Sequence, residues 1–340
     1  MERRYRVAIA GCHRMLDRAP AGHNWAAAFA ADPRAELVAV FDKGADTRRA
    51  FLDCWGPLPA FDDYAALLAA VRPEVVCIAT RQTLHAAQLE RAVAAGVRGI
   101  LCDKPLATSL GEVDRIVAAC DRPGVAFAFG LDRRWDPTYR ALAQLLRDGA
   151  IGEVRAVVGW GLPNLINHGC HWFDRLLDFA GDPEVAAVAG RLDPLAGLPA
   201  DARQRLDPPG SCQLLLANGV EAFASPAGGV GFDVVGTGGR LLVLGDGAEA
   251  HLWTGAGDGR APVERELPLP PPAAAGPRAV ADLLDAIAAG RPTLADVHAA
   301  RRATEVGFAA HQSHREGGRR IAPAEADRGL RIASFPWGNE

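Results

Sequence analysis

Short apolar runs alternate with helical stretches through the first third of the chain. Five of these runs are almost continuously apolar, at residues 5–10, 36–41, 74–79, 99–102 and 125–129. Such runs are typical of parallel strands that are buried on both faces of a sheet. Because amphipathic helical stretches separate them, the pattern favours right-handed βαβ units. It therefore predicts an α/β fold with a doubly wound parallel sheet, a Rossmann fold, over residues 1–125.

Helix-capping signals accompany three of the helical stretches in this region. Asp62 is a candidate N-cap, and Ser109 with Glu112 has the spacing of a capping box. Gly96 follows another stretch in the position where helices commonly end. These signals support the alternation of strands and helices.

The pattern changes after about Gly130. A helix is expected over residues 137–147, and two pairs of strand-like runs then flank Asn218-Gly219 and Asp246-Gly247. Both dipeptides are typical of the type I′ turn of a β-hairpin. Residues 126–340 are therefore predicted to form an α+β domain with a largely antiparallel sheet.

Prolines mark a connection within this second region. Residues 267–277 are rich in proline, which cannot donate to a strand ladder, so this stretch is expected to be extended. Two further helices are expected behind it, one ending at Gly290 and one over residues 296–314.

Length and composition narrow the class of protein. A chain of 340 residues is too long for one ordinary core, which agrees with two domains. A net charge of -4 and a pI near 6.2 give no electrostatic reason to expect nucleic acid or an anionic membrane as partner. Seven scattered cysteines without a C-x-x-C pair are typical of reduced thiols, and neither a signal peptide nor an apolar run of membrane-spanning length is present. We therefore expect a cytoplasmic protein that binds a small molecule.

Lysine is rare in this chain, so its positions are informative. Only Lys43 and Lys104 are lysines among 37 lysine and arginine residues. A partly buried lysine can release its proton, whereas arginine keeps its own. Lys104 follows the apolar run 99–102, and open α/β sheets bind ligands at the carboxyl ends of such strands. Lys104 is a candidate for proton transfer; a strand-end lysine in water is the open alternative.

A glycine-containing loop follows the first apolar run, where a dinucleotide-binding fold holds the pyrophosphate. Gly11 fills the first glycine position, but His13 and Leu16 occupy the next two positions of G-x-G-x-x-G. The loop continues to Gly22, ahead of an alanine-rich stretch. We predict an enlarged phosphate loop with Gly22 as the helix-entry glycine.

An acid at the end of the second apolar run supports this prediction. Asp42 lies twenty residues after Gly22, close to the spacing expected between such a loop and a ribose-binding acid. Its charge favours NAD over NADP, and the neighbouring Lys43 weakens that preference. Arg14 and Arg18 are predicted to be free to meet phosphate. A solvated strand-end acid beside an ordinary loop is the alternative.

A second cluster of polar residues precedes a helical stretch in the C-terminal half. Asn167 suits an N-cap, which places His171 in the first turns of the helix, where the dipole favours a neutral imidazole. A neutral imidazole can act as a general base. His168 and Cys170 suggest a metal site, but no further pair at ligand spacing completes it, so no metal is predicted. A capped helix with a surface histidine explains the same residues.

Four segments in order resemble motifs of the Gfo/Idh/MocA family, which is named after glucose-fructose oxidoreductase, inositol dehydrogenase and a rhizopine-catabolism protein. Residues 78–85 are similar to A-T-P-N-x-x-H, residues 102–107 to E-K-P-L-A, residues 130–137 to G-x-N-x-R-x-x-P, and residues 167–174 to D-x-G-x-H-x-x-D. Each motif is loose, but their order and spacing along nearly the whole chain are specific.

The resemblance implies hydride transfer between a nicotinamide and a hydroxyl-bearing carbon of a sugar, cyclitol or polyol, with Lys104, His171 and Asn167 in the catalytic group. Cofactor binding, by NAD or NADP, is assigned to Gly11, His13, Arg14, Gly22, Asp42, Lys43, Ala79, Thr80, His85, Asp103 and Lys104. Substrate contacts are assigned to Arg134, Trp135, Trp160, Asn167 and His171, with core packing as the alternative for the tryptophans. A homodimer or homotetramer, assembled through the second domain, is also implied.

Departures from the family motifs keep other functions open. Asn167 replaces the catalytic aspartate, and Asp174 is the candidate to supply the missing charge to His171 or only to support the helix. A lyase or glycosidase that retains NAD and oxidises its substrate transiently uses the same Lys104 and His171. A non-catalytic binding protein of the same fold is the third alternative.

Overall fold

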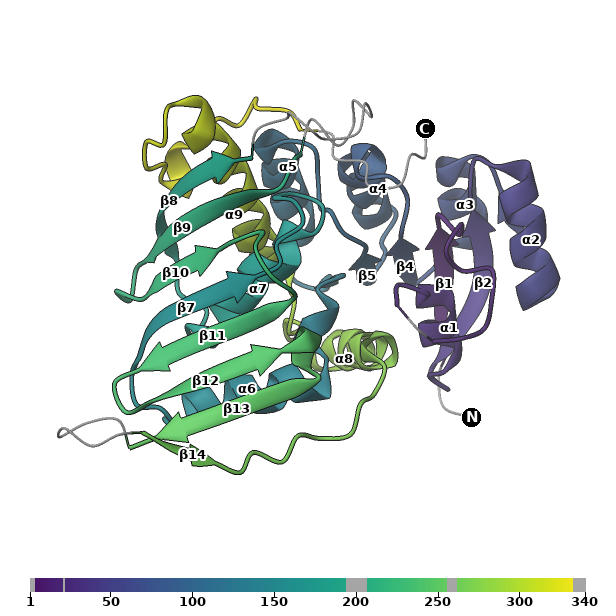
Figure 1. The fold of residues 1–340 in the computed structure, drawn as a ribbon. Coiled ribbons are helices and arrows are strands. Elements are labelled where there is room, and N and C mark those ends of the chain that lie inside the picture. The colour runs from purple at the N-terminus through teal and green to yellow at the C-terminus, as the bar shows by residue number, and fades with distance from the viewer. Residues whose placement is uncertain (1–3, 21, 194–206, 256–261, 333–340) are drawn as a thin grey trace. The chain divides into compact units, whose positions relative to one another are not determined.

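The computed structural model describes residues 4–20, 22–193, 207–255 and 262–332. The chain divides into two compact units, drawn in Figure 1. The first unit comprises Met1–Asp136 and Ala273–Arg301, and the second comprises Pro137–Pro272 and Arg302–Glu340. The first unit therefore extends past residue 125 and also contains a segment from late in the chain, whereas the sequence predicted two contiguous domains with a boundary at residue 125.

A six-stranded parallel sheet forms the centre of the first unit, in the order β3-β2-β1-β4-β5-β6. Its strands are β1 (Tyr5–Ala10), β2 (Ala35–Phe41), β3 (Ala60–Phe61), β4 (Val75–Ile78), β5 (Gly99–Cys102) and β6 (Ala126–Phe129). The strand order reverses between β1 and β4, and ligands of open α/β sheets bind outside the carboxyl ends at such a point. The predicted doubly wound sheet is confirmed.

Helices of the first unit alternate with its strands along the chain, except for a last helix that comes from much later in the sequence. They are α1 (Trp25–Ala30), α2 (Ala45–Trp55), α3 (Tyr64–Val71), α4 (Gln82–Ala94), α5 (Leu110–Cys120) and α8 (Ala275–Ala289), with the 3-10 turn η1 at Asp132–Arg134. The N-cap of α3 is Asp63, one residue after the predicted Asp62. Ser109 caps α5 as predicted, whereas the Glu112 carboxylate accepts the N–H of Thr108 at 2.7 Å instead of that of Ser109.

Packing explains why α8 belongs to this unit although its sequence lies far along the chain. It packs against β5, β6 and α1. Gly99 on β5 leaves the space that the Ile287 side chain of α8 fills, since a Cβ at Gly99 would overlap it. β6 in turn completes the parallel sheet beside β5. The division at residue 125 therefore omits both the last strand and the helix that covers it.

An eight-stranded sheet forms the second unit, in the order β14-β13-β12-β11-β7-β10-β9-β8. Its strands are β7 (Val154–Trp160), β8 (Val185–Leu192), β9 (Gly210–Leu216), β10 (Glu221–Ala224), β11 (Gly231–Gly236), β12 (Gly239–Leu244), β13 (Glu249–Thr254) and β14 (Val263–Arg265). Among these strands only β7 and β10 pair in parallel, so the predicted, largely antiparallel sheet is confirmed.

The helices of the second unit include α6 (Pro137–Arg147) and α7 (Gly169–Phe179), with 3-10 turns η2 (Gly245–Gly247) and η3 (Pro323–Glu325). α7 packs on β7 and β10 and against α6. The helix α9 (Val297–Arg315) begins in the first unit and continues into the second. The helices predicted at 137–147 and 296–314 thus form within one residue of their expected bounds.

The two predicted hairpins form with different turns. Asp246 and Gly247 both have positive φ, at 58° and 89°, as a type I′ turn requires. In the other hairpin Gly219 has a φ of 84°, whereas Asn218 is outside the positive region, so this turn is not type I′. Both dipeptides nevertheless lie between paired antiparallel strands.

All seven cysteines are free thiols, as their scattered positions predicted. Burial raises the pKa of Cys120 and of Cys212 to about 12, which keeps both thiols protonated and unreactive. In the part of the chain that the structure describes, no helix has the length and apolar character that crossing a membrane requires.

Candidate active site

Gly11 ends β1 in a conformation that only glycine adopts readily. Its φ is 85°, and a Cβ would lie 2.6 Å from the carbonyl carbon and oxygen of Ala79. The Gly11 N–H donates to the carbonyl of Phe41 at 2.8 Å. The ends of β1, β2 and β4 therefore meet closely around this residue, at the switch point of the sheet.

The enlarged loop after Gly11 is organised by Asn24. The Asn24 side chain caps α1 by accepting the Ala27 N–H at 3.2 Å, and its amide N–H groups donate to the carbonyls of Asp17 and Ala19, each at 3.0 Å. Gly22 precedes the helix with a φ of 56°, in agreement with its expected position at the helix entry.

The basic residues of this loop differ in their contacts. The Arg18 guanidinium donates twice to the Cys54 carbonyl, at 3.0 and 2.9 Å, and stacks over Trp55. Arg18 is therefore held by α2, contrary to the prediction that it is free to meet phosphate. His13 is exposed, and the Arg14 guanidinium lies 3.6 Å from a carboxylate oxygen of Asp103.

Asp42 is half-buried at the end of β2, and its carboxylate faces the loop. One oxygen accepts the Cys12 N–H at 3.0 Å and the other accepts the Gly44 N–H at 2.9 Å. Arg48 donates to the Asp42 carbonyl at 2.6 Å, while Lys43 is exposed. The acid is thus fixed by backbone groups on both sides, with lone pairs left for further donors.

The end of β4 is tied to the segment after β5 by a buried histidine. The two ring nitrogens of His85 lie 3.0 Å from the Thr80 carbonyl and 3.1 Å from the Leu106 carbonyl. Burial lowers the pKa of His85, which favours the neutral ring. The Thr80 hydroxyl donates to Gln88 at 2.5 Å. His85 therefore supports the loops that carry Thr80 and Lys104 and is itself fully buried.

Asp103 and Lys104 follow β5 and are both buried. One oxygen of the Asp103 carboxylate lies 2.8 Å from Nδ1 of His23 and accepts the Lys104 N–H at 2.9 Å. Although its own burial acts in the opposite direction, the charges of His23, Arg14 and Lys104 hold the pKa of Asp103 well below its usual range. The carboxylate is therefore ionised and connects the loop after β1 with Lys104.

His23 was not predicted as a site residue. Burial lowers its pKa, but the charge of Asp103 and the hydrogen bond to it outweigh burial and raise it. The sequence offers one signal for this role, a histidine placed directly after Gly22 at the helix entry. Its partner lies eighty residues away, so spacing alone does not reveal the pair.

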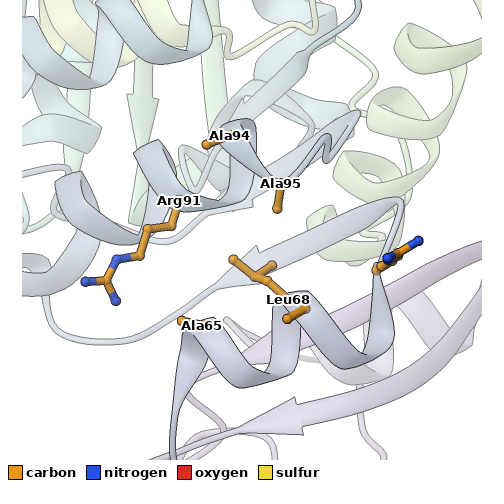
Figure 2. Close-up of a pocket in the computed structure, with 7 residues that line it drawn as sticks. Ala65, Leu68, Arg91, Ala94 and Ala95 are labelled. Carbon is orange, nitrogen blue, oxygen red and sulfur yellow. The ribbon is translucent and has the colours of Figure 1, made fainter.

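A pocket of about 530 Å³ lies elsewhere in the first unit, between α3 and α4 (Figure 2). Its walls are Ala65, Leu68, Ala69, Arg72, Arg91, Ala94 and Ala95, and Leu68 points from α3 toward α4. Arg72 precedes β4 and Ala95 precedes β5, so the pocket reaches the amino ends of these strands. It contains none of the predicted site residues, which follow the carboxyl ends.

In the second unit, Asn167 lies just before α7 and His171 lies within it. The helix begins at Gly169 with His168 as its cap, so Asn167, the predicted N-cap, lies one residue before the observed one. The Asn167 amide donates to Nδ1 of His168 at 2.9 Å, and the Asn164 amide lies 3.2 Å from the same nitrogen. Asn167 therefore orients His168, while His171 lies in the first turn of α7, as expected, and is buried.

Asp174 has a partner of its own on the same helix. Its carboxylate lies 2.9 Å from the guanidinium of Arg175, which is fully buried and also pairs with Asp178 at 2.6 Å. Of the two roles considered for Asp174, this contact fits support of the helix. No group of three or more side chains suited to a metal ion occurs among the residues that the structure describes.

The aromatic and basic residues assigned to the substrate differ in accessibility. Trp160 ends β7 with 37% of its surface exposed, and its carbonyl accepts the indole N–H of Trp172 at 2.7 Å. Trp135 is 1% exposed and donates to Asp282 at 3.0 Å within the first unit, which fits core packing. Arg134 is largely buried in η1.

Comparison with known proteins shows a similarity within the first unit. Residues 5–131 match the model of the Gfo/Idh/MocA proteins, described as "Oxidoreductase family, NAD-binding Rossmann fold". Over these residues the chain is similar to the Gfo/Idh/MocA family. The match covers the strands and loops that carry every residue assigned to the cofactor, and the NAD-binding Rossmann fold of the family is the fold of the first unit.

The curated relatives of this chain align over part of their length. D-apiose dehydrogenase of Paraburkholderia graminis is 40% identical over 118 residues, which are 35% of this chain and 31% of the relative. D-glucoside 3-dehydrogenase of Escherichia coli is 27% identical over 202 residues, 54% of this chain and 56% of the relative. The aligned part is thus less than two thirds of either relative.

The whole fold has counterparts among solved structures. A putative NADPH-dependent oxidoreductase from Desulfitobacterium hafniense superposes with a TM-score of 0.79 at 22% identity, over 96% of this chain and 99% of that chain. At this identity the likeness concerns the fold, and it extends the similarity into the second unit.

Proposed function

We propose that this protein is an NAD(P)-dependent oxidoreductase that acts on a CH–OH group of a sugar, cyclitol or polyol derivative. The observation that carries the proposal is the environment of Lys104, a buried lysine beside an ionised aspartate at the carboxyl end of a parallel strand. Such a lysine can hold and polarise a substrate oxygen. Gly11, Asp42 and Thr80 follow the carboxyl ends of the neighbouring strands.

The residues of the first unit suit a dinucleotide by their chemistry. In the proposal the backbone of the loop from Gly11 to Gly22, with Arg14, holds the phosphates, and Asp42 accepts from the ribose hydroxyls. Ala79 and Thr80 lie at the switch point for the nicotinamide half. When bound, the nicotinamide supplies the hydride acceptor or donor. Asp42 favours NAD, although Lys43 beside it makes NADP the alternative.

Proton handling is assigned to Lys104 of the first unit and His171 of the second. In the proposal Lys104 polarises the substrate hydroxyl and lowers its pKa, and His171 takes the proton as a general base. Asn167 then orients the imidazole of His168 or a substrate hydroxyl, without the charge that an aspartate offers.

The substrate class and the partners rest on similarity. The relatives named above are dehydrogenases of an aldose and of a glucoside, which supports a sugar-like substrate. Trp160, with an exposed indole surface, and Arg134 are proposed to contact it. We also propose a cytoplasmic homodimer or homotetramer.

The test combines cofactor identification with a turnover assay. Mass spectrometry of the denatured protein identifies a retained nicotinamide dinucleotide, and absorbance at 340 nm follows a panel of sugars and cyclitols with added NAD or NADP. Continuous NADH or NADPH formation supports the proposal. Product without net reduced cofactor identifies the NAD-retaining lyase or glycosidase, and binding of a sugar without any product identifies the non-catalytic protein.

A further inference from the structure

Asp207, in the second unit, has a carboxylate that gathers an unusual number of donors. It accepts the backbone N–H groups of three consecutive residues, Leu165 at 3.1 Å, Ile166 at 3.0 Å and Asn167 at 3.1 Å. Nε2 of His311 lies 3.1 Å from the same carboxylate. The Asp207 side chain is 1% exposed and that of His311 is 4% exposed. A buried carboxylate is retained only where such donors compensate its lost hydration.

These contacts determine the backbone immediately before α7. Three consecutive N–H groups can converge on one carboxylate only in a restricted backbone conformation, so Asp207 fixes residues 165–167. Asn167 is the last of the three, and its side chain donates to His168. His171 follows in the first turn of the helix that begins at Gly169.

The helix α9 supplies the residue that contacts Asp207 from the other side, His311. Gly307 lies one turn before His311 on this helix, and a Cβ at Gly307 would lie 2.5 Å from the Leu165 carbonyl. The close approach of α9 brings the imidazole of His311 to the carboxylate and supplies its fourth donor. Asp207 therefore joins α9 to the loop that leads into α7.

We propose that Asp207 and His311 form a positioning pair that sets the orientation of Asn167 and His171 for proton transfer. The inference rests on the proposed function in assigning the proton to His171. It adds two residues, neither within the motifs that carry the family resemblance, whose action on the reaction passes through the backbone of residues 165–167. The cofactor-binding residues belong to the first unit, so the pair affects turnover and not cofactor affinity.

The experiment compares Asp207→Asn with a matched control. The control is Asp233→Asn, which removes another buried carboxylate of the second unit, paired with Arg240 at 2.6 Å on the sheet. We expect Asp207→Asn to lower kcat about 100-fold, with the NADH dissociation constant within about twofold of wild type. The control is expected to keep kcat within about twofold at a comparable loss in Tm.

His311 provides a conservative test of the same pair. His311→Gln retains an N–H donor at the end of its side chain and is expected to keep most of kcat. His311→Leu has no such donor, and its kcat is expected to fall as much as that of Asp207→Asn. Equal kcat in Asp207→Asn and Asp233→Asn would overturn the proposal. So would an unchanged kcat in His311→Leu.

A second readout separates this proposal from the proposed function. The imidazole signals of His171, assigned with His171→Gln, are followed by NMR through a pH titration without substrate. We expect the His171 titration to change in Asp207→Asn and to remain unchanged in Asp233→Asn. Suppose that neither the wild type nor any variant shows turnover, but the His171 titration still changes in Asp207→Asn. The proposed redox function then fails, whereas the positioning pair is supported. An unchanged His171 titration in Asp207→Asn overturns the positioning pair.

Discussion

Nδ1 of His23 lies 2.8 Å from a carboxylate oxygen of Asp103, which joins the loop after β1 to the residue that precedes Lys104. Arg14 approaches the other oxygen of the same carboxylate at 3.6 Å. The loop assigned to the phosphates and the lysine assigned to the substrate are therefore connected through one buried carboxylate. Changes at this pair should affect cofactor binding and turnover together.

Stability should depend on pH through His23. Its folded-state pKa is raised, so the contribution of the ion pair is fully present below the ordinary value of 6.5 and is lost as the pH rises through the raised pKa. Asp103 stays ionised in this range because its pKa is lowered. The Tm difference between wild type and His23→Gln should therefore be largest near about pH 6 and shrink toward about pH 9. A difference that is independent of pH would contradict the ion pair.

Replacing Lys104 by arginine should strongly reduce turnover but leave cofactor binding nearly unchanged. Lys104→Arg preserves the positive charge beside Asp103 and replaces a side chain that can release its proton by one that keeps it. We expect kcat to fall by about 100-fold or more, because general acid–base groups commonly contribute that much. The dissociation constant of NADH, measured by fluorescence, should change by less than about threefold. Normal turnover in this variant would remove Lys104 from the proposed chemistry.

Gly11 should be intolerant of any side chain. Gly11→Ala imposes a positive φ on alanine and places its Cβ 2.6 Å from the Ala79 carbonyl. Gly96→Ala is the matched control, because Gly96 has nearly the same φ, 84°, with nothing within 4 Å of its Cβ position. Urea unfolding should show a loss of free energy for Gly11→Ala that exceeds the control by about 2 kcal/mol. Equal losses would mean that the close approach to β4 costs nothing.

Cofactor preference should depend on Asp42. Asp42→Ala removes the charge that repels a 2′-phosphate and leaves Lys43 next to the site, so the ratio of NADP to NAD affinity should rise at least about tenfold. Because the Asp42 carboxylate also accepts the Cys12 and Gly44 N–H groups, a moderate loss of Tm is expected in parallel. Binding titrations with NADH and NADPH measure the ratio, and Lys43→Ala should move it in the opposite direction.

Most strands and helices of the first unit could be predicted from local patterns in the sequence. The runs at 5–10 and 99–102 became β1 and β5 with unchanged bounds, because a strand buried on both faces has a composition of its own. The glycine at the end of β1 and the acid at the end of β2 were found from a motif and a spacing. Such signals lie within a few dozen residues of one another.

Contacts between residues that are far apart in the sequence could not be predicted from these local patterns. His23 and Asp103 are eighty residues apart, and Asp207 meets residues 165–167 and His311 only through folding. Trp135 lies within residues 130–137, a segment that resembles a family motif, but it is buried in the core, where its indole donates to Asp282 on a helix far along the chain. In each case the deciding partner lies on an element that is distant along the chain.

The position of α8 also constrains the order in which the protein is made. The helix that covers β5 and β6 lies in Ala273–Arg301, so the ribosome synthesises all of Pro137–Pro272 before the first unit can be completed. Until then the apolar surface around Gly99 stays exposed on the nascent chain, where chaperones or premature association can act on it. A gene fragment that stops at Asp136 should therefore yield an aggregation-prone polypeptide, and supplying Ala273–Arg301 in the same chain should restore its solubility.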